Sequence, residues 1–175
     1  MTAEESTKKR DSMNGIWRLD KNRGEWSMRG YLETLNVNEL AIQAHEKGES
    51  EYDTFHTIKI NGQSIQIVKR SRVNNDLVVE LTLGEEKVEY LQPGDRPKKM
   101  LATSEDIGLD LKIESSLLTM NGMAHVIDTK SLIQEDDKSI LVQELTIVNE
   151  QTGNTSTTTR YFVPHDTPLD NMETG

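Results

Sequence analysis

Apolar and polar residues alternate along most of the chain after residue 54, and this period of two predicts β-strands. Leu77, Val79 and Leu81, for example, share one face of an extended segment. Turn residues separate such segments, among them Asn61-Gly62, which is typical of a type I′ hairpin. Short strands at this spacing indicate an antiparallel meander or barrel. The clearest strands are expected at Phe55–Asn61, Leu109–Ile113, His125–Ile133, Ile140–Val148 and Thr157–Val163.

One stretch, from Ser27 to Lys47, follows the helical period instead. Asn36 interrupts it, so we expect two short helices, with Asn38 as the N-cap of the second and Gly48 at its end. The order of elements is then one strand, two helices and roughly nine further strands. The apolar positions that define the helical period are Met28, Tyr31, Leu32, Leu35, Leu40, Ala41 and Ala44.

The two ends of the chain are polar and aperiodic, which predicts disordered tails at residues 1–13 and 165–175 around one barrel domain at residues 14–164. The chain has no cysteine, so disulfides and thiolate–metal sites are excluded. No apolar run approaches the roughly 20 residues that span a bilayer, and the first residues lack the apolar stretch of a signal peptide. We therefore expect a cytoplasmic protein.

The formal net charge is −10, and such a field repels the phosphates of nucleic acids. The second predicted helix and its exit carry Glu39, Glu46, Glu49 and Glu51, with Lys47 as the only base. A negatively charged leaflet would repel that surface. We expect a monomer with no nucleic-acid partner and at most transient membrane contact.

Six short segments match motifs of a known family, and they occur in the same order as in that family. Together they resemble the intracellular fatty-acid-binding proteins, a family that includes the cellular retinoid-binding proteins within the lipocalin-like superfamily. Each segment alone is a weak match, and their order carries the resemblance. It implies an all-β fold, a ten-stranded antiparallel up-and-down β-barrel with a two-helix lid between the first and second strands. The segments are Gly15–Trp17, Tyr31–Val37, Leu81–Glu86, Gly94–Lys99, Thr129–Leu132 and Thr159–Phe162.

In that family an inward Arg, a Tyr two positions later and an Arg on the neighbouring hairpin hold a ligand carboxylate. The resemblance places these roles on Arg160, Phe162 and Lys130, and Thr158 shares the strand face of Arg160. Phe162 lacks the hydroxyl and Lys130 lacks the planar fork of Arg, so an alcohol or aldehyde head group remains an alternative to an acid. Arg160 could instead lie on the outer face, and Lys130 could pair with Asp128, two residues earlier on the same face.

The resemblance also implies that the lid and nearby hairpin turns cover the mouth of the cavity. A stripe of this kind could equally serve ordinary core packing. The expected ligand contacts here are Met28, Tyr31, Leu32 and Val37 in the lid, and Val73 and Pro93 in the turns.

The sequence contains no nucleophile-elbow, P-loop or EF-hand motif, and its four histidines show no metal-ligand spacing. We therefore expect no catalytic residue, no metal and no cofactor. The leading prediction is an intracellular carrier that binds a long-chain fatty acid or similar apolar anion inside the barrel. Two alternatives stay open: a barrel that serves as a protein-interaction module, and an enzyme that acts on a bound apolar substrate.

Overall fold

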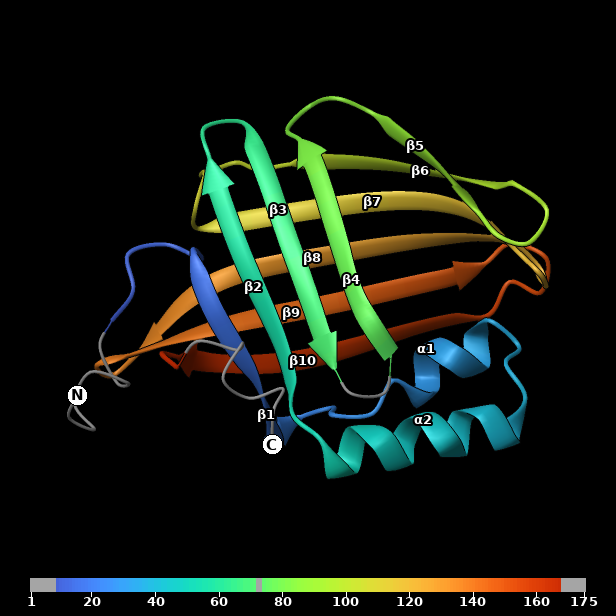
Figure 1. Ribbon diagram of the computed structural model, residues 1–175, viewed down its shortest axis with the longest axis horizontal. Helices are drawn as coiled ribbons and strands as arrows, with labels where there is room; N and C mark the ends of the chain where they lie inside the picture. Colours follow the sequence, from blue (N-terminus) through green and yellow to red (C-terminus); the bar gives the residue numbers. More distant parts are fainter. Residues whose placement is uncertain (1–8, 72–73, 168–175) are drawn as a thin grey trace.

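A computed structural model describes residues 9–71 and 74–167, which form ten β-strands and two α-helices (Figure 1). The helices are α1 (Arg29–Thr34) and α2 (Glu39–Glu51), and both lie between the first two strands. The strands are β1 (Gly15–Gly24), β2 (Thr54–Asn61), β3 (Ser64–Ser71), β4 (Asn74–Thr82), β5 (Lys87–Leu91), β6 (Arg96–Thr103), β7 (Asp110–Thr119), β8 (Gly122–Glu135), β9 (Lys138–Asn149) and β10 (Thr155–His165).

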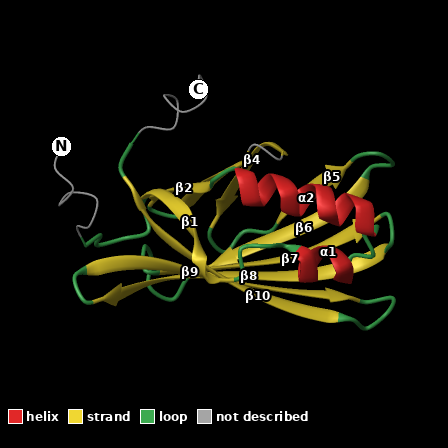
Figure 2. Cartoon of the chain, turned by 90° about the horizontal axis from the view of Figure 1, so that it is seen from below, coloured by secondary structure: helices red, strands yellow, loops and turns green. Residues whose placement is uncertain are grey.

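The strands form one antiparallel sheet in the order β4-β3-β2-β1-β10-β9-β8-β7-β6-β5. β1 joins the first strands to the last ones, because it pairs with β2 on one side and β10 on the other, and the curled sheet forms a nearly closed barrel. Among the described residues, β4 and β5 are the two edges and share no ladder. The barrel is flattened, with β2, β3 and β4 crossing over β7 to β10, and α1 and α2 lie side by side along one side of it (Figures 1 and 2). The predicted fold is confirmed.

The turn between β2 and β3 differs in type from the expectation. Asn61 pairs with Ser64, so the two loop residues are Gly62 and Gln63. Gly62, at the first loop position, has a φ of 61°, and Gln63 is not among the described residues with positive φ. A type I′ turn requires positive φ at both positions, whereas a type II′ turn requires it only at the first, where glycine is favoured. The hairpin was correctly predicted, and its turn has the II′ pattern.

The two helices are separated as predicted, but the second is longer and turned differently. Asn36 adopts a φ of 58° between them, and the Asn38 side chain accepts a hydrogen bond from the backbone N–H of Ala41 at 2.9 Å. The predicted end at Gly48 is wrong, because α2 continues to Glu51. The expected apolar face is also wrong: Leu40 is 79% exposed, and α2 buries Ile42 and Glu49 instead.

The described part of the N-terminal segment packs on the barrel upstream of the predicted boundary at residue 14. Met13 is fully buried, and its backbone N–H donates to the carbonyl of Gly108 at 2.8 Å. The Arg10 guanidinium lies 4.7 Å from the ring centroid of Trp17. At the other end β10 includes His165, one residue beyond the predicted limit. Within the described ranges, no helix has the length and apolar character needed to cross a membrane.

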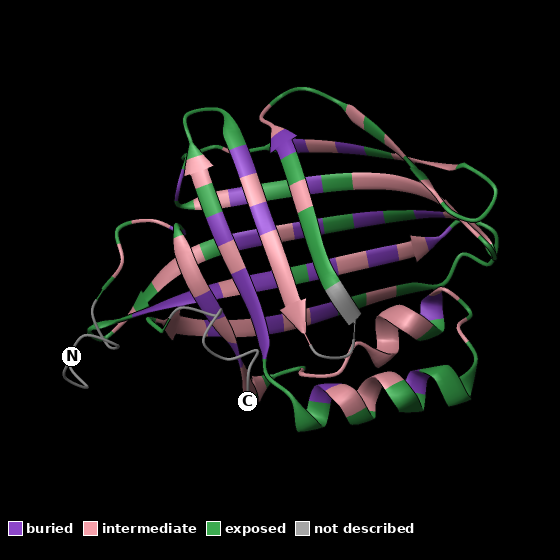
Figure 3. Cartoon of the chain, in the orientation of Figure 1, coloured by how far each residue is buried: buried purple, intermediate pink, exposed green. Residues whose placement is uncertain are grey.

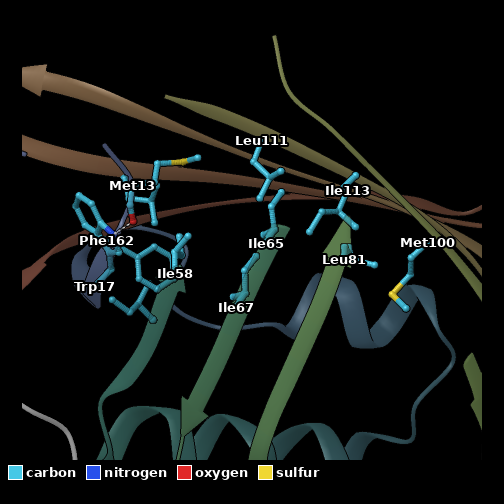
Figure 4. Packing of buried hydrophobic residues seen from close by; sticks show 13 residues of the cluster. Met13, Trp17, Ile58, Ile65, Ile67, Leu81, Met100, Leu111, Ile113 and Phe162 are labelled. Atoms are coloured by element: carbon cyan, nitrogen blue, oxygen red, sulfur yellow. Dashed lines mark hydrogen bonds between the residues drawn. The ribbon is translucent and has the colours of Figure 1, made fainter. Parts of the chain in front are cut away.

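Two apolar clusters fill the interior, because buried positions alternate along the strands, as Figure 3 shows for β8 and β9. The larger cluster surrounds Trp17, whose indole N–H donates to the Met13 carbonyl at 2.8 Å (Figure 4). The smaller lies beneath the lid, where residues of the α1 region pack on β8 and β9. Its members are Ala124, Val126, Leu145 and Ile147, with Met28, Tyr31, Leu35 and Leu117 against them.

The two tryptophans should differ in access to a quencher. Trp17 has no exposed surface, whereas Trp26 is only partly buried. We expect acrylamide to quench the Trp26→Phe variant, which retains Trp17, several-fold less than the Trp17→Phe variant. Near-identical strong quenching of both variants would contradict the packing of β1, provided that circular dichroism shows both to be folded.

Candidate functional site

A cavity of about 370 Å³ lies inside the barrel beneath the helices. Residues of both apolar clusters border it, the larger one around Trp17 and the smaller one under the lid. Its volume is within the range of pockets that enclose a small ligand. The apolar lining residues are Met28, Leu32, Leu77, Val79, Met100, Ile113, Leu117, Val126 and Leu145.

One wall of the interior carries a row of polar side chains from three neighbouring strands. Arg160 on β10 is the direct cross-strand partner of Gln143 on β9, which in turn is the partner of Lys130 on β8. All three are buried. Because residues two apart share a strand face, Asp128 and Thr158 extend this inward-facing surface. The inward orientation of Arg160, one of two alternatives left by the sequence, is therefore the one observed.

Asp128 is the centre of a buried cluster of charges. Its carboxylate accepts hydrogen bonds from Lys130 Nζ at 2.9 Å and Gln143 Nε2 at 3.1 Å, and Lys69 Nζ lies 3.7 Å away. Burial by itself raises the pKa of Asp128, but the two lysines lower it by more, and the resulting pKa is about 2. Asp128 is thus a carboxylate at neutral pH, and Lys130 is neutralised within the protein.

The facing wall, on β2 and β3, adds His56 and Lys69, which are cross-strand partners. Burial, reinforced by nearby cations, holds the pKa of His56 well below 6.5, so its ring is neutral. Burial also lowers the pKa of Lys69 to about 8, with a further lowering by the charge of Lys130. Lys69 is still mainly protonated at pH 7 and borders the cavity as a second cation beside Arg160.

Arg160 is buried with its hydrogen-bonding capacity largely unused. Its Nη1 donates to the sulfur of Met28 at 3.4 Å, and its Nη2 lies 3.7 Å from Oε2 of Glu49. Neither Nε nor Nη2 has a hydrogen-bond partner among the described residues. Burial lowers the pKa of Arg160, and the charges of Glu49 and Asp128 oppose that lowering. Because arginine remains charged in proteins, Arg160 is a buried cation at the cavity wall with two donor atoms that lack a hydrogen-bond partner among the described residues.

The lid supplies Glu49, and three links hold it in place. Arg29 of α1 donates to Glu46 at 2.6 Å and to Glu39 at 2.8 Å, which joins α1 to α2. The Asn149 side chain donates to the carbonyl of Thr34 at 2.9 Å, which joins α1 to the barrel. The face of α2 that carries Ile42 therefore turns inward, and Glu49, two turns later, enters the cavity.

The structure brings only part of the predicted ligand contacts to the cavity surface. Met28, Tyr31, Leu32 and Arg160 line it. Burial and the charge of Asp128 raise the pKa of Tyr31 to about 12, so its hydroxyl remains protonated. Phe162 does not line the cavity but packs in the core, 4.5 Å from the His56 ring between centroids.

The remaining predicted contacts lie away from the cavity surface. Lys130 and Thr158 are buried and inward-facing but do not line the cavity, and Lys130 forms the pair with Asp128 that the sequence left as an alternative. Val37 is partly buried and Pro93 exposed, and neither borders the cavity. Val73 lies outside the described residues.

Several polar cavity residues were not among the predicted contacts, including His56, Lys69, Gln143 and Glu49. The sequence contains a signal for Lys69, because it follows Ile65 and Ile67 at a period of two and so shares their buried face. Glu49 carries no such signal, because its helix was assigned the wrong inward face.

A separate hydrogen-bonded chain lies on the outer surface of β7, β8 and the turn between β9 and β10. His125 Nδ1 contacts the Ser116 hydroxyl at 2.7 Å, and its Nε2 contacts the carboxylate of Glu150. The order of groups resembles a nucleophile, a base and an acid. However, His125 and Glu150 are 47% and 46% exposed, and none of the three borders the cavity. The arrangement is solvated and does not support an enzyme that acts on a ligand inside the barrel.

The nearly closed barrel, the two-helix lid and the interior cavity are the features of the fold of the fatty-acid-binding and cellular retinoid-binding proteins. Lipid binding protein 8 of Caenorhabditis elegans has this fold, with a TM-score of 0.61 and 18% identity over 94% of this chain and 99% of that one. Human cRBP IV has a TM-score of 0.59 at 18% identity over 89% of this chain and 100% of that one.

A third similar structure is a Schistosoma mansoni fatty acid binding protein in complex with arachidonic acid, with a TM-score of 0.58 and 14% identity over 89% of this chain and 98% of that one. No protein-family model matches the chain, and no curated protein matches its sequence. The comparisons thus confirm the resemblance in fold.

Proposed function

We propose that the chain is an intracellular carrier that reversibly binds a long-chain fatty acid or similar apolar anion inside the barrel. The observation that carries the proposal is the buried Arg160, which lines the cavity and whose Nε and Nη2 have no hydrogen-bond partner among the described residues. A buried donor without a partner is costly, so a ligand that supplies the acceptor gains that free energy. The carrier acts as a monomer with at most transient membrane contact.

The charge balance of the cavity wall supports an anionic ligand. Among the described lining residues, Lys69, Arg70, Lys98 and Arg160 are cationic, against the carboxylates of Glu49 and Asp128. Arg70 is neutralised by Asp76 at 2.7 Å, which leaves the three cations Lys69, Lys98 and Arg160 against two carboxylates among the described lining residues. Deep in a low-dielectric interior, such an excess attracts an anion more strongly than it would at the surface.

The apolar tail provides most of the binding free energy. Each buried methylene contributes about 0.8 kcal/mol, so roughly 14 of them contribute about 11 kcal/mol before association costs are subtracted. Micromolar binding requires about 8 kcal/mol. The tail alone nearly reaches that value, and the polar wall mainly orients the head group and selects its chemistry.

Native mass spectrometry of freshly purified protein tests the proposal. We expect one lipid-sized adduct per barrel, and one equivalent of long-chain fatty acid bound after delipidation. A barrel that remains empty and binds no fatty acid would favour the interaction module. Conversion of an added apolar ligand into a product of different mass would favour the enzyme.

A further inference from the structure

Glu49 is an acidic residue of the lid that reaches into the barrel. It is 4% exposed, and with Ile42 it is one of the two buried residues of α2. Its Oε1 lies 2.9 Å from His45 Nδ1, and its Oε2 lies 3.7 Å from Arg160 Nη2. A buried carboxylate is stable only beside compensating charge, and Arg160 is the buried cation that faces it.

Glu49 occupies the side of the guanidinium at which a ligand would bind. Arg160 Nη2, the atom closest to Glu49, is also one of the two guanidinium nitrogens without a hydrogen-bond partner in the described ranges. A ligand carboxylate on these donors would therefore stand beside a second carboxylate. Two carboxylates that share one site repel each other strongly, so the acid and Glu49 cannot both be held there as anions without cost.

A neutral hydroxyl head group, in contrast, carries no charge that Glu49 would repel. Oε2 of Glu49 is an acceptor without a hydrogen-bond partner, and Nε of Arg160 is a donor without one, among the residues that the structure describes. A hydroxyl can accept from Arg160 and donate to Glu49 at the same time. The pair thus offers an alcohol both of its hydrogen bonds, whereas it offers a carboxylate one cation and one competing anion.

We propose that Glu49 competes with the ligand's head group for Arg160 and so sets the preference of the cavity between acidic and hydroxyl-bearing lipids. The inference rests on the proposed carrier function and names the residue that tunes it. In the unliganded barrel Glu49 neutralises Arg160, and an acid binds only by displacing it. Displacement moves Glu49 and the last turn of α2 away from the cavity.

Glu49→Gln tests the competition, because it removes the charge at nearly constant shape. Glu51→Gln is the matched control, since it removes the same charge from an exposed site on the same helix. Dissociation constants for oleic acid and oleyl alcohol are measured by displacement of a fluorescent fatty acid. We expect Glu49→Gln to shift the acid-to-alcohol affinity ratio toward the acid by at least about tenfold. Glu51→Gln should leave the ratio unchanged.

Hydrogen exchange of the parent protein gives an independent reading that needs no variant. Oleic acid should speed exchange in the last turn of α2, whereas oleyl alcohol should slow it. An unchanged ratio in Glu49→Gln, or protection of α2 by the acid, would overturn the competition and leave the carrier function intact. A parent protein that binds neither ligand would overturn the carrier function, and with it the role of Glu49. Thermal unfolding of each variant confirms that the fold is retained.

Discussion

Changing Arg160 to Gln should lower the affinity for a long-chain fatty acid by roughly 10- to 150-fold, because a charge-assisted hydrogen bond contributes about 1.5–3 kcal/mol. The affinity for the matching alcohol should fall much less, since the tail supplies most of its binding. Arg160 is 5% exposed and borders the cavity, so the change acts directly on the head-group site. The ratio of the two affinities is the informative quantity, because general damage to the fold cancels in it.

The same substitution leaves the buried Glu49 without its cation, and this would destabilise the barrel. The comparison should therefore also be made between Glu49→Gln and the double variant Glu49→Gln, Arg160→Gln, neither of which retains the Glu49 carboxylate without its cation. Acid binding should be lost selectively in both comparisons: from the parent to Arg160→Gln, and from Glu49→Gln to the double variant. If Arg160→Gln binds acid and alcohol as the parent does, Arg160 is not the head-group residue and the carrier proposal loses its main support.

Changing Asp128 to Asn should lower the free energy of unfolding by about 3–5 kcal/mol, the usual cost of removing one partner from a buried ion pair. Lys130 is 1% exposed and bonds to Asp128 at 2.9 Å, and Lys69 lies 3.7 Å from the same carboxylate. Without Asp128 both ammonium groups stay inside the barrel with no carboxylate between them. Urea denaturation measures the loss, and Asp128→Leu combined with Lys130→Met should recover much of it.

Glu114→Gln provides the control on the outer surface. Its carboxylate pairs with Lys112 at 2.8 Å, but both side chains are about half exposed, at 51% and 46%. A surface pair of this kind contributes no more than about 1 kcal/mol. If Asp128→Asn costs no more than Glu114→Gln, the charges around Asp128 are hydrated rather than buried.

The dependence of stability on acidic pH should also test the charge cluster around Asp128. The pKa of Asp128 in the folded protein is about 2, below its value near 3.9 in an unfolded chain. The contribution of the ionised Asp128 to the free energy of unfolding is fully present above about pH 4 and is lost as the pH falls toward 2. Over that interval the stability of Asp128→Asn should decline less steeply than that of the parent. Parallel declines would indicate that Asp128 has an ordinary pKa.

The sequence by itself determined the barrel and the inner face of most of its strands. On a strand successive side chains point to opposite sides, so the pattern of apolar residues also assigns the polar ones between them. For this reason Asp128 and Lys130 were expected on one strand face, whereas the inward orientation of Arg160 was implied by the family resemblance, and the Lys130–Asp128 pair was one of two alternatives that the sequence left open. The helix break at Asn36 and the cap at Asn38 could be foreseen too, because both depend on local backbone chemistry.

Only the tertiary structure decided which inward polar groups meet. Lys69 reaches Asp128 because the flattened barrel brings β3 over β8, and no local pattern encodes that approach. The rotation of α2 was also beyond the sequence, because its apolar residues are too few to define a face. Leu40 is therefore left in solvent, and burial of Ile42, the bridge from Arg29 and the pairing of Glu49 with Arg160 orient the helix. These are long-range contacts, and their free energy outweighs the weak amphipathic preference of a short helix.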